Sequence, residues 1–158
     1  MSRIKEVIIT SGIPGAGKST WVRKNTNPYM TEIFSADNFF LNEHGTYLFD
    51  PKKLPEAHAN CLKNYAIRLL HLVNSKNNSC DITLVIDNTN TSAWEIAPYY
   101  SLAEAFDIPV KIIRLMALPE DAFSRNIHGV EKDKVEIMSK RMDQNPLPPF
   151  WNIEIIKK

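Results

Sequence analysis

The chain has 158 residues and a formal net charge of +1 at pH 7. This length suits one domain with a single hydrophobic core, so we expect residues 1–158 to form one domain. The apolar share of 44% and the charged share of 23% are ordinary for a globular protein and argue against disorder. The small net charge disfavours a binder of long duplex DNA, although a local basic patch is enough for a short nucleic-acid end.

The amino-terminal residues run directly into a strand pattern and contain no long apolar segment of the signal-peptide kind. No apolar run approaches the roughly 20 residues that span a bilayer, so we expect no membrane association and a cytoplasmic location. Cys61 and Cys80 have neither CxxC nor Cys/His spacing. We interpret them as small buried hydrophobic residues rather than as a disulfide or a reactive thiol.

The first predicted elements surround a glycine-rich loop. Residues 7–10 form a short β-branched run, which is typical of a strand buried on both faces. The loop 11–17 follows, and residues 18–25 are predicted to form the first helix. Residues 33–34 predict a second, weaker strand that ends at a polar turn.

The middle of the chain contains the longest predicted helix and the clearest predicted strand. The helix covers residues 55–75, because apolar residues recur there at three- and four-residue steps. The strand covers residues 82–86. A further helix is expected to begin at Ser92, which has capping-box spacing to Glu95. Pro98 is placed to kink or split that helix.

The last third continues the alternation, with a strand over residues 110–116, helices over 119–127 and 132–142, and a strand over 152–156. The proline-rich residues 145–149 are either a rigid connector packed by the aromatic residues that follow or a ligand for a proline-binding module, and we favour the connector. Alternating strands and helices indicate an α/β sheet with helices on both faces.

Residues 12–19, GIPGAGKS, match the phosphate-binding pattern GxxxxGK[ST] in full. Glycines let such a loop wrap around a phosphate, its N–H groups form an anion nest, and the following helix adds its positive end. Lys18 is predicted to reach the β- and γ-phosphates of a nucleotide, and the Ser19 hydroxyl to ligate Mg²⁺. The position between a strand and a helix argues against a chance glycine-rich turn. The predicted nucleotide-binding residues of this segment are Gly12, Ile13, Pro14, Gly15, Ala16, Gly17, Lys18, Ser19 and Thr20.

Phosphate binding leaves three classes open: a kinase, a GTPase switch and a mechanical ATPase. The guanine-reading NKxD segment of a GTPase is missing from the sequence. The predicted strand 82–86 ends in Asp87-Asn88, without the Glu that activates water in many mechanical ATPases. The sequence therefore favours transfer of the phosphoryl group to another acceptor.

Four segments occur in order: GIPGAGKSTW at residues 12–21, SADNFF at 35–40, DNTN at 87–90 and RNIHG at 125–129. In this combination the chain resembles the kinase domain of polynucleotide 5′-hydroxyl kinases from phages and animals, and related P-loop kinase-like proteins. The resemblance covers roughly residues 5–143, and its last two segments are more selective than the phosphate-binding loop. It implies a P-loop kinase fold, a three-layer α/β sandwich with a mostly parallel five-stranded sheet of order 2-3-1-4-5, with ATP and Mg²⁺ as cofactors.

The resemblance also implies roles for three charged residues. Asp37 matches the aspartate that accepts the proton of the attacking hydroxyl; otherwise it caps a turn. Asp87 resembles the residue that organises Mg²⁺ and its waters through Ser19; otherwise it is a simple turn carboxylate. Arg125 falls in the family's lid, where it stabilises the transferring phosphoryl group or covers the nucleotide; otherwise it is a solvated surface residue.

The acceptor side is expected to involve Asp37, Phe40, Asn88, Thr89, Asn90 and His128. His128 either touches the phosphate or acceptor or caps a helix. Phe40 departs from the phage enzymes, which carry an arginine at its position. Aromatic side chains within residues 39–51 either stack on a base or fold back into a small core.

The preferred acceptor is the 5′-hydroxyl of a DNA or RNA end. Two alternatives stay open at this point: a kinase for a small-molecule alcohol, such as a nucleoside, sugar or antibiotic, and a non-catalytic ATP-binding module.

Overall fold

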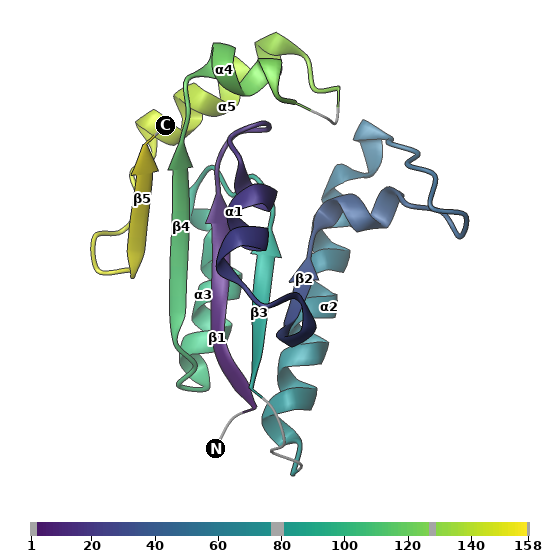
Figure 1. Ribbon diagram of the computed structural model, residues 1–158, viewed down its shortest axis with the longest axis vertical. Coiled ribbons are helices and arrows are strands. Elements are labelled where there is room, and N and C mark those ends of the chain that lie inside the picture. Colours follow the sequence, from purple (N-terminus) through teal and green to yellow (C-terminus); the bar gives the residue numbers. More distant parts are fainter. Residues whose placement is uncertain (1–2, 77–80, 127–128, 158) are drawn as a thin grey trace.

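The computed structural model describes residues 3–76, 81–126 and 129–157, and within them five strands form one parallel sheet (Figure 1). The strand order is β2-β3-β1-β4-β5, which confirms the expected order 2-3-1-4-5. The strands are β1 (Ile4–Ser11), β2 (Thr31–Phe34), β3 (Ile82–Asp87), β4 (Val110–Met116) and β5 (Ile153–Lys157).

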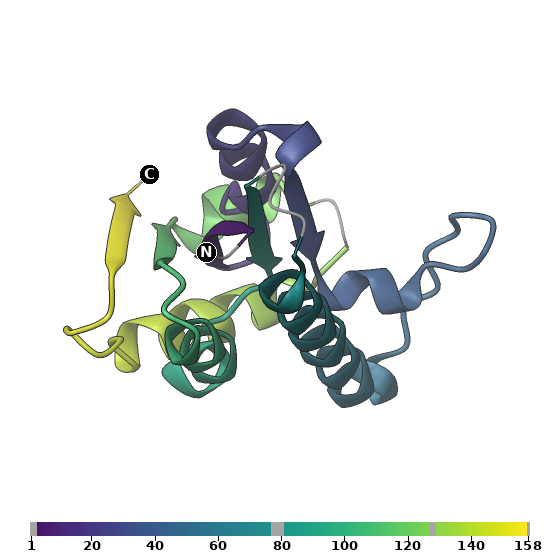
Figure 2. The same cartoon turned by 90° about the horizontal axis from the view of Figure 1, so that it is seen from below.

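Helices cover both faces of this sheet. The α-helices are α1 (Lys18–Asn25), α2 (Leu54–Asn74), α3 (Ala93–Ala105), α4 (Pro119–Ser124) and α5 (Lys132–Gln144). Short 3₁₀ helices are η1 (Pro28–Met30), η2 (Ala36–Phe40) and η3 (Pro51–Lys53). Figure 2 shows α2 and α3 on one side of the sheet and α1 on the other.

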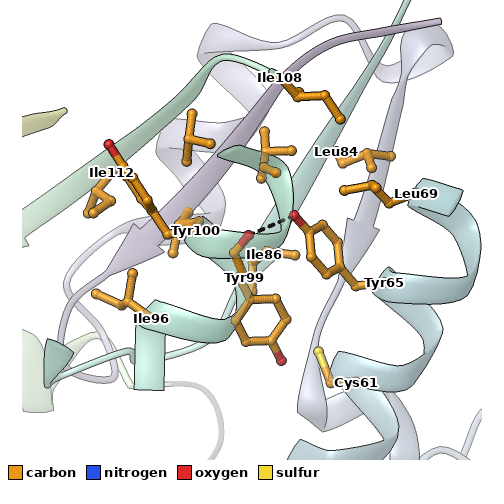
Figure 3. Packing of buried hydrophobic residues seen from close by; sticks show 14 of the residues in the cluster. Cys61, Tyr65, Leu69, Leu84, Ile86, Ile96, Tyr99, Tyr100, Ile108 and Ile112 are labelled. Carbon is orange, nitrogen blue, oxygen red and sulfur yellow. Dashed lines mark hydrogen bonds between the residues drawn. The ribbon is translucent and has the colours of Figure 1, made fainter. Parts of the chain in front are cut away.

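The two faces bury separate hydrophobic clusters, because successive residues of a strand point to opposite sides. Val7 and Ile9 pack with residues of α2 and α3, whereas Ile8 packs with residues of α1, α4 and α5. In Figure 3 the hydroxyl of Tyr65 donates a hydrogen bond of 2.9 Å to the backbone carbonyl of Tyr99. This bond satisfies the one polar atom of a fully buried side chain.

Cys61 is buried in the larger of these clusters, as expected, and Cys80 lies outside the described residues. No helix in the described part of the chain combines the length and the apolar character that crossing a bilayer requires.

Most predicted boundaries hold to within two residues, but one local prediction was wrong. The helix expected over 119–127 ends at Ser124, because the next two backbone N–H groups bond three residues back and tighten the turn. The helix predicted to begin at Ser92 is confirmed, since Ser92 is the N-cap residue of α3. Its hydroxyl donates to the Glu95 carboxylate, which also accepts from the Thr91 N–H. Pro98 lies inside α3 without splitting it.

The proline-rich connector is packed by only one of the two aromatic residues that follow it. The Trp151 ring stacks on Tyr100 with 4.8 Å between centroids, whereas Phe150 is 83% exposed. The connector is therefore anchored by Trp151 and by its own Leu147, which is buried in the larger hydrophobic cluster.

Candidate nucleotide and acceptor site

The carboxyl ends of β1 and β3 bring the phosphate-binding loop and Asp87 together. The two strands are parallel neighbours, and their register places Thr10 opposite Asp87. The Asp87 carboxylate accepts a hydrogen bond from the Thr10 hydroxyl on Oδ1 and one from the Ser19 hydroxyl on Oδ2, both at 3.2 Å. One carboxylate thus links the end of β1 to the first turn of α1.

The loop between β1 and α1 depends on left-handed backbone at two glycines. Gly15 has φ +84° and Gly17 has φ +97°, a region that side chains with a Cβ rarely adopt. A Cβ on Gly15 would also lie 1.8 Å from the carbonyl oxygen of Ala122. Gly17 precedes α1, whose first backbone N–H groups have no intrahelical acceptor and are available to an anion.

Lys18 lies folded over this loop. Its ammonium donates hydrogen bonds to the carbonyl oxygens of Gly12, at 2.9 Å, and Ile13, at 3.1 Å. Burial lowers the pKa of Lys18 to about 8, while the charges of Asp87 and Asp37 oppose that shift. Both carboxylates are therefore close enough to the ammonium to act on it electrostatically.

Asp37 reaches this position because η2 is fixed to the end of β3. The Asn88 side-chain oxygen accepts a 2.8 Å hydrogen bond from the Ala36 N–H, and its amide nitrogen contacts the Cys61 sulfur at 3.6 Å. The Ser35 hydroxyl oxygen accepts from the Asp37 N–H at 3.2 Å. The structure thus brings Asp37 to the same edge of the sheet as Asp87 and Lys18.

The rest of the DNTN segment braces the phosphate-binding loop. The carbonyl oxygen of Thr89 accepts from the Gly12 N–H at 2.8 Å. Asn90 has φ +44° and is 2% exposed; its side-chain amide donates to the Thr10 carbonyl oxygen, and its own carbonyl accepts from the Ser11 hydroxyl. These described contacts of Thr89 and Asn90, like those of Asn88, are with the protein itself.

Arg125 lies on the opposite side of the loop, directly after α4. Its side chain is exposed, and its Nε donates a 3.0 Å hydrogen bond to the carbonyl oxygen of Gly15. The structure therefore brings Arg125 to the nucleotide-binding loop. His128 lies outside the described residues.

The aromatic residues near Asp37 form a cluster around Phe40. Phe40 is 5% exposed, and its ring contacts the rings of Phe39, Tyr47 and Phe49. The segment thus folds back into a small core, yet Tyr47 and Phe49 remain 36% and 48% exposed. The Tyr47 hydroxyl donates to Asp37 Oδ1 at 3.3 Å.

Sequence reasoning missed two residues that support the site, Thr10 and Arg114, and it missed the contact of Tyr47 with Asp37. Arg114 is 4% exposed, and its guanidinium donates to the Ser11 hydroxyl and to the Met142 carbonyl oxygen, each at 3.0 Å. It thereby joins the end of β1 to the end of α5. An arginine with apolar residues on both sides, in the run Ile112–Met116, was the available signal, because a buried charge needs partners.

Comparison with known proteins agrees with this geometry. Residues 7–144 match the protein-family model described as AAA domain. Human NEDD4-binding protein 2 is 33% identical over 138 residues, which cover 84% of this chain and 7% of that protein. The chain therefore spans only a small part of the length of this relative.

Two solved structures share the fold. A chain of the Pnkp1/Rnl/Hen1 RNA repair complex superposes with a TM-score of 0.66 at 16% identity, covering 89% of this chain and 45% of that chain. A putative kinase from Chloroflexus aurantiacus superposes with a TM-score of 0.67 at 19% identity, covering 99% and 86%. The family match confirms the predicted resemblance: the chain belongs to the AAA domain family represented by that model and is a P-loop kinase-like domain.

Proposed function

We propose that this protein transfers the γ-phosphoryl group of ATP to the 5′-hydroxyl of a polynucleotide. The observation that carries the proposal is the position of Asp37 in η2, which follows the carboxyl end of β2 and is held to the end of β3 by the hydrogen bond between the Ala36 N–H and Asn88. A carboxylate at this position can orient an alcohol that approaches the γ-phosphate and can take its proton.

In this reaction the loop N–H groups and Lys18 hold the phosphates, and Arg125 stabilises the charge on the transferring group. The acceptor oxygen forms a bond to the γ-phosphorus while the bond to the bridging β–γ oxygen breaks. The proton of the acceptor hydroxyl passes to Asp37, and the bonding electrons leave with ADP. The products are ADP and a 5′-phosphate monoester.

The residues beside the loop fit a magnesium ion. Among the described residues there is no group of three His, Cys, Asp or Glu side chains that could hold a metal. Mg²⁺ does not need three such side chains, because it keeps several waters and binds through one or two protein groups plus substrate phosphates. The Ser19 hydroxyl would ligate it and Asp87 would hold its waters, and the ion would neutralise charge on the β- and γ-phosphate oxygens.

The aromatic surface beside Asp37 supports a nucleic-acid acceptor. Tyr47 and Phe49 stack on each other with 6.2 Å between centroids and 10° between ring planes, and both are partly exposed. Bases of single strands stack on side chains of this kind. The shared fold with a chain of an RNA repair complex is consistent with such an acceptor.

One observation favours a second candidate, a small-molecule alcohol such as a nucleoside. A cavity of about 290 Å³ lies beside η2. Two of its lining residues, Ser35 and Asn38, flank Asp37, and Asn60 and Asn64 of α2 add side-chain amides. Amide groups can pair with the hydrogen-bonding edge of a base or a sugar.

The deciding experiment is transfer from γ-labelled ATP, with Mg²⁺, to 5′-hydroxyl DNA and RNA oligonucleotides and to free nucleosides. We expect labelled oligonucleotides, and a roughly 10²- to 10⁴-fold lower rate in Asp37→Asn with ATP affinity retained. Asp107→Asn is the matched control, because it removes the same charge from an exposed residue in the turn before β4.

Label on nucleosides alone would replace the polynucleotide with the second candidate. ATP binding without acceptor-dependent ADP release would instead identify a non-catalytic nucleotide-binding module.

A further inference from the structure

The segment after η2 is a small hairpin with a defined shape. Leu41 and Tyr47 pair as an antiparallel bridge. Between them, the Asn42 side-chain oxygen accepts two backbone N–H hydrogen bonds of 2.9 Å, and Gly45 takes φ +76°. Local hydrogen bonds of this kind fix a turn, so the point at which Tyr47 leaves the hairpin is fixed as well.

Ring packing fixes the direction of the Tyr47 side chain. The Phe40 ring lies 6.1 Å from the Tyr47 ring, edge to face, and Phe49 stacks on Tyr47 from another side. The Leu48 N–H donates a 2.8 Å hydrogen bond to the Phe40 carbonyl oxygen, which holds the hairpin against η2. Tyr47 is therefore held by its backbone and by its ring.

The hydroxyl of this fixed ring reaches the carboxylate of Asp37. The Oη–Oδ1 separation of 3.3 Å is longer than the roughly 2.5–3.0 Å that is usual for an O–H···O hydrogen bond. Burial raises the pKa of Tyr47, and the charge of Asp37 and its hydrogen bond raise it further. The two groups therefore interact electrostatically as well as by contact.

We propose that Tyr47 is a positioning residue that orients the Asp37 carboxylate toward the acceptor hydroxyl. This inference rests on the proposed function, in which Asp37 is the base. The Asp37 carboxylate can rotate about its Cβ–Cγ bond, because that torsion has only broad, two-fold preferences. A hydrogen-bond donor fixed at Oδ1 therefore holds the plane of the carboxylate in one orientation.

The kinetic test compares Tyr47→Phe with Tyr29→Phe in the 5′-hydroxyl oligonucleotide assay. Tyr47→Phe keeps the ring packing and removes only the hydroxyl, whereas Tyr29 is 92% exposed and lies in η1. We expect Tyr47→Phe to lower kcat about tenfold, without changing the KM for ATP, because hydrogen bonds to charged groups have effects of that order. The Tm of Tyr47→Phe should stay that of the parent, whereas a loss of packing would lower it.

A second measurement does not depend on the acceptor. The pKa of Tyr47 is followed by NMR with ¹³Cζ-labelled tyrosine, its resonance being assigned from the spectrum of Tyr47→Phe. In Asp37→Asn we expect this pKa to fall toward the ordinary value, because the neighbouring negative charge is gone.

The two measurements separate the possible failures. A Tyr47 pKa that does not change in Asp37→Asn overturns the inference, and so does a Tyr47→Phe variant with the kcat of the parent. If no oligonucleotide is phosphorylated, the proposed function fails. The Tyr47 pKa measured in Asp37→Asn then still shows whether Tyr47 contacts the Asp37 carboxylate.

Discussion

The nucleotide side and the acceptor side of this site are built in different ways. Thr10 and Ser11 at the end of β1 are fully buried, and their hydrogen bonds lead to β3, β4 and the segment after β3. Residues 41–49, by contrast, are all exposed and lie beyond the β2 edge of the sheet (Figure 1).

We infer from this difference that phosphate binding and the choice of acceptor depend on separate parts of the molecule. Groups that hold phosphate rest on the two central strands, where neighbouring backbone determines their positions. Tyr47 and Phe49, the exposed aromatic residues beside Asp37, instead lie on a hairpin held mainly by its own turn and by aromatic packing. Loops of this kind can change without disturbing the sheet, which makes them suited to setting specificity.

The largest effect is expected when only the nucleotide side is changed. Lys18→Ala should lower kcat for phosphoryl transfer by roughly 10²- to 10³-fold, because it removes a positive charge directed at the developing charge of the phosphoryl group. Lys24→Ala, an exposed residue in the last turn of α1, is the control for loss of a nearby charge. Steady-state kinetics with a saturating acceptor measure the effect, and equal activity of both variants would contradict the assignment.

Two glycines with similar φ allow a direct comparison of rigidity. Gly15→Ala should destabilise the fold strongly, because the Cβ meets the Ala122 carbonyl oxygen and the backbone must also take a left-handed conformation. Gly45→Ala meets no atom within 4 Å, so only the conformational cost of about 1–2 kcal/mol applies.

Thermal unfolding should therefore show a Tm loss of roughly 2–8 °C for Gly45→Ala and a larger loss for Gly15→Ala. Equal Tm losses would mean that the phosphate-binding loop accommodates an added Cβ as easily as the hairpin does.

A smaller effect is expected when the exposed aromatic surface is cut back. Phe49→Ala should raise the KM for an oligonucleotide by roughly 5- to 150-fold, the range expected for losing one stacked base, and leave the KM for ATP unchanged. Phe150→Ala is the control, since Phe150 is 83% exposed and lies just before β5 at the other edge of the sheet. If Phe49→Ala leaves the KM for the oligonucleotide unchanged, the exposed aromatic residues no longer support a nucleic-acid acceptor.

The smallest predicted effect is a pH dependence confined to the nucleotide side. The pKa of Lys18 is lowered to about 8, so its ammonium is present below that pH and is lost as the pH rises through it. ATP affinity should fall about tenfold between pH 7 and pH 9, because near pH 9 only about one lysine in eleven keeps its proton. Calorimetric titration measures the affinity, and the weaker binding of Lys18→Ala should show no such fall.

Much of the fold and the nucleotide side was predictable from the sequence. The short apolar runs and the GxxxxGK[ST] pattern placed β1, the loop and α1, and the DNTN segment placed Asp87 at the end of β3. The Ser19–Asp87 hydrogen bond follows once β1 and β3 are neighbours, because parallel strands present their carboxyl ends at one edge. The partners of Asn88 and Asn90 were not predictable, since an amide gives no sign of whether it faces the protein or a ligand.

The sequence by itself determined the elements, the phosphate-binding loop and the strand ends, because periodicity and backbone chemistry act over a few residues. Only the tertiary structure decided that Tyr47 reaches Asp37, that Arg114 joins β1 to α5, and that Phe40 is buried while Phe150 is exposed. Those contacts depend on how irregular segments pack against the sheet. Pairing of that kind is set by the shape and hydrogen-bonding capacity of distant partners, which no local pattern encodes.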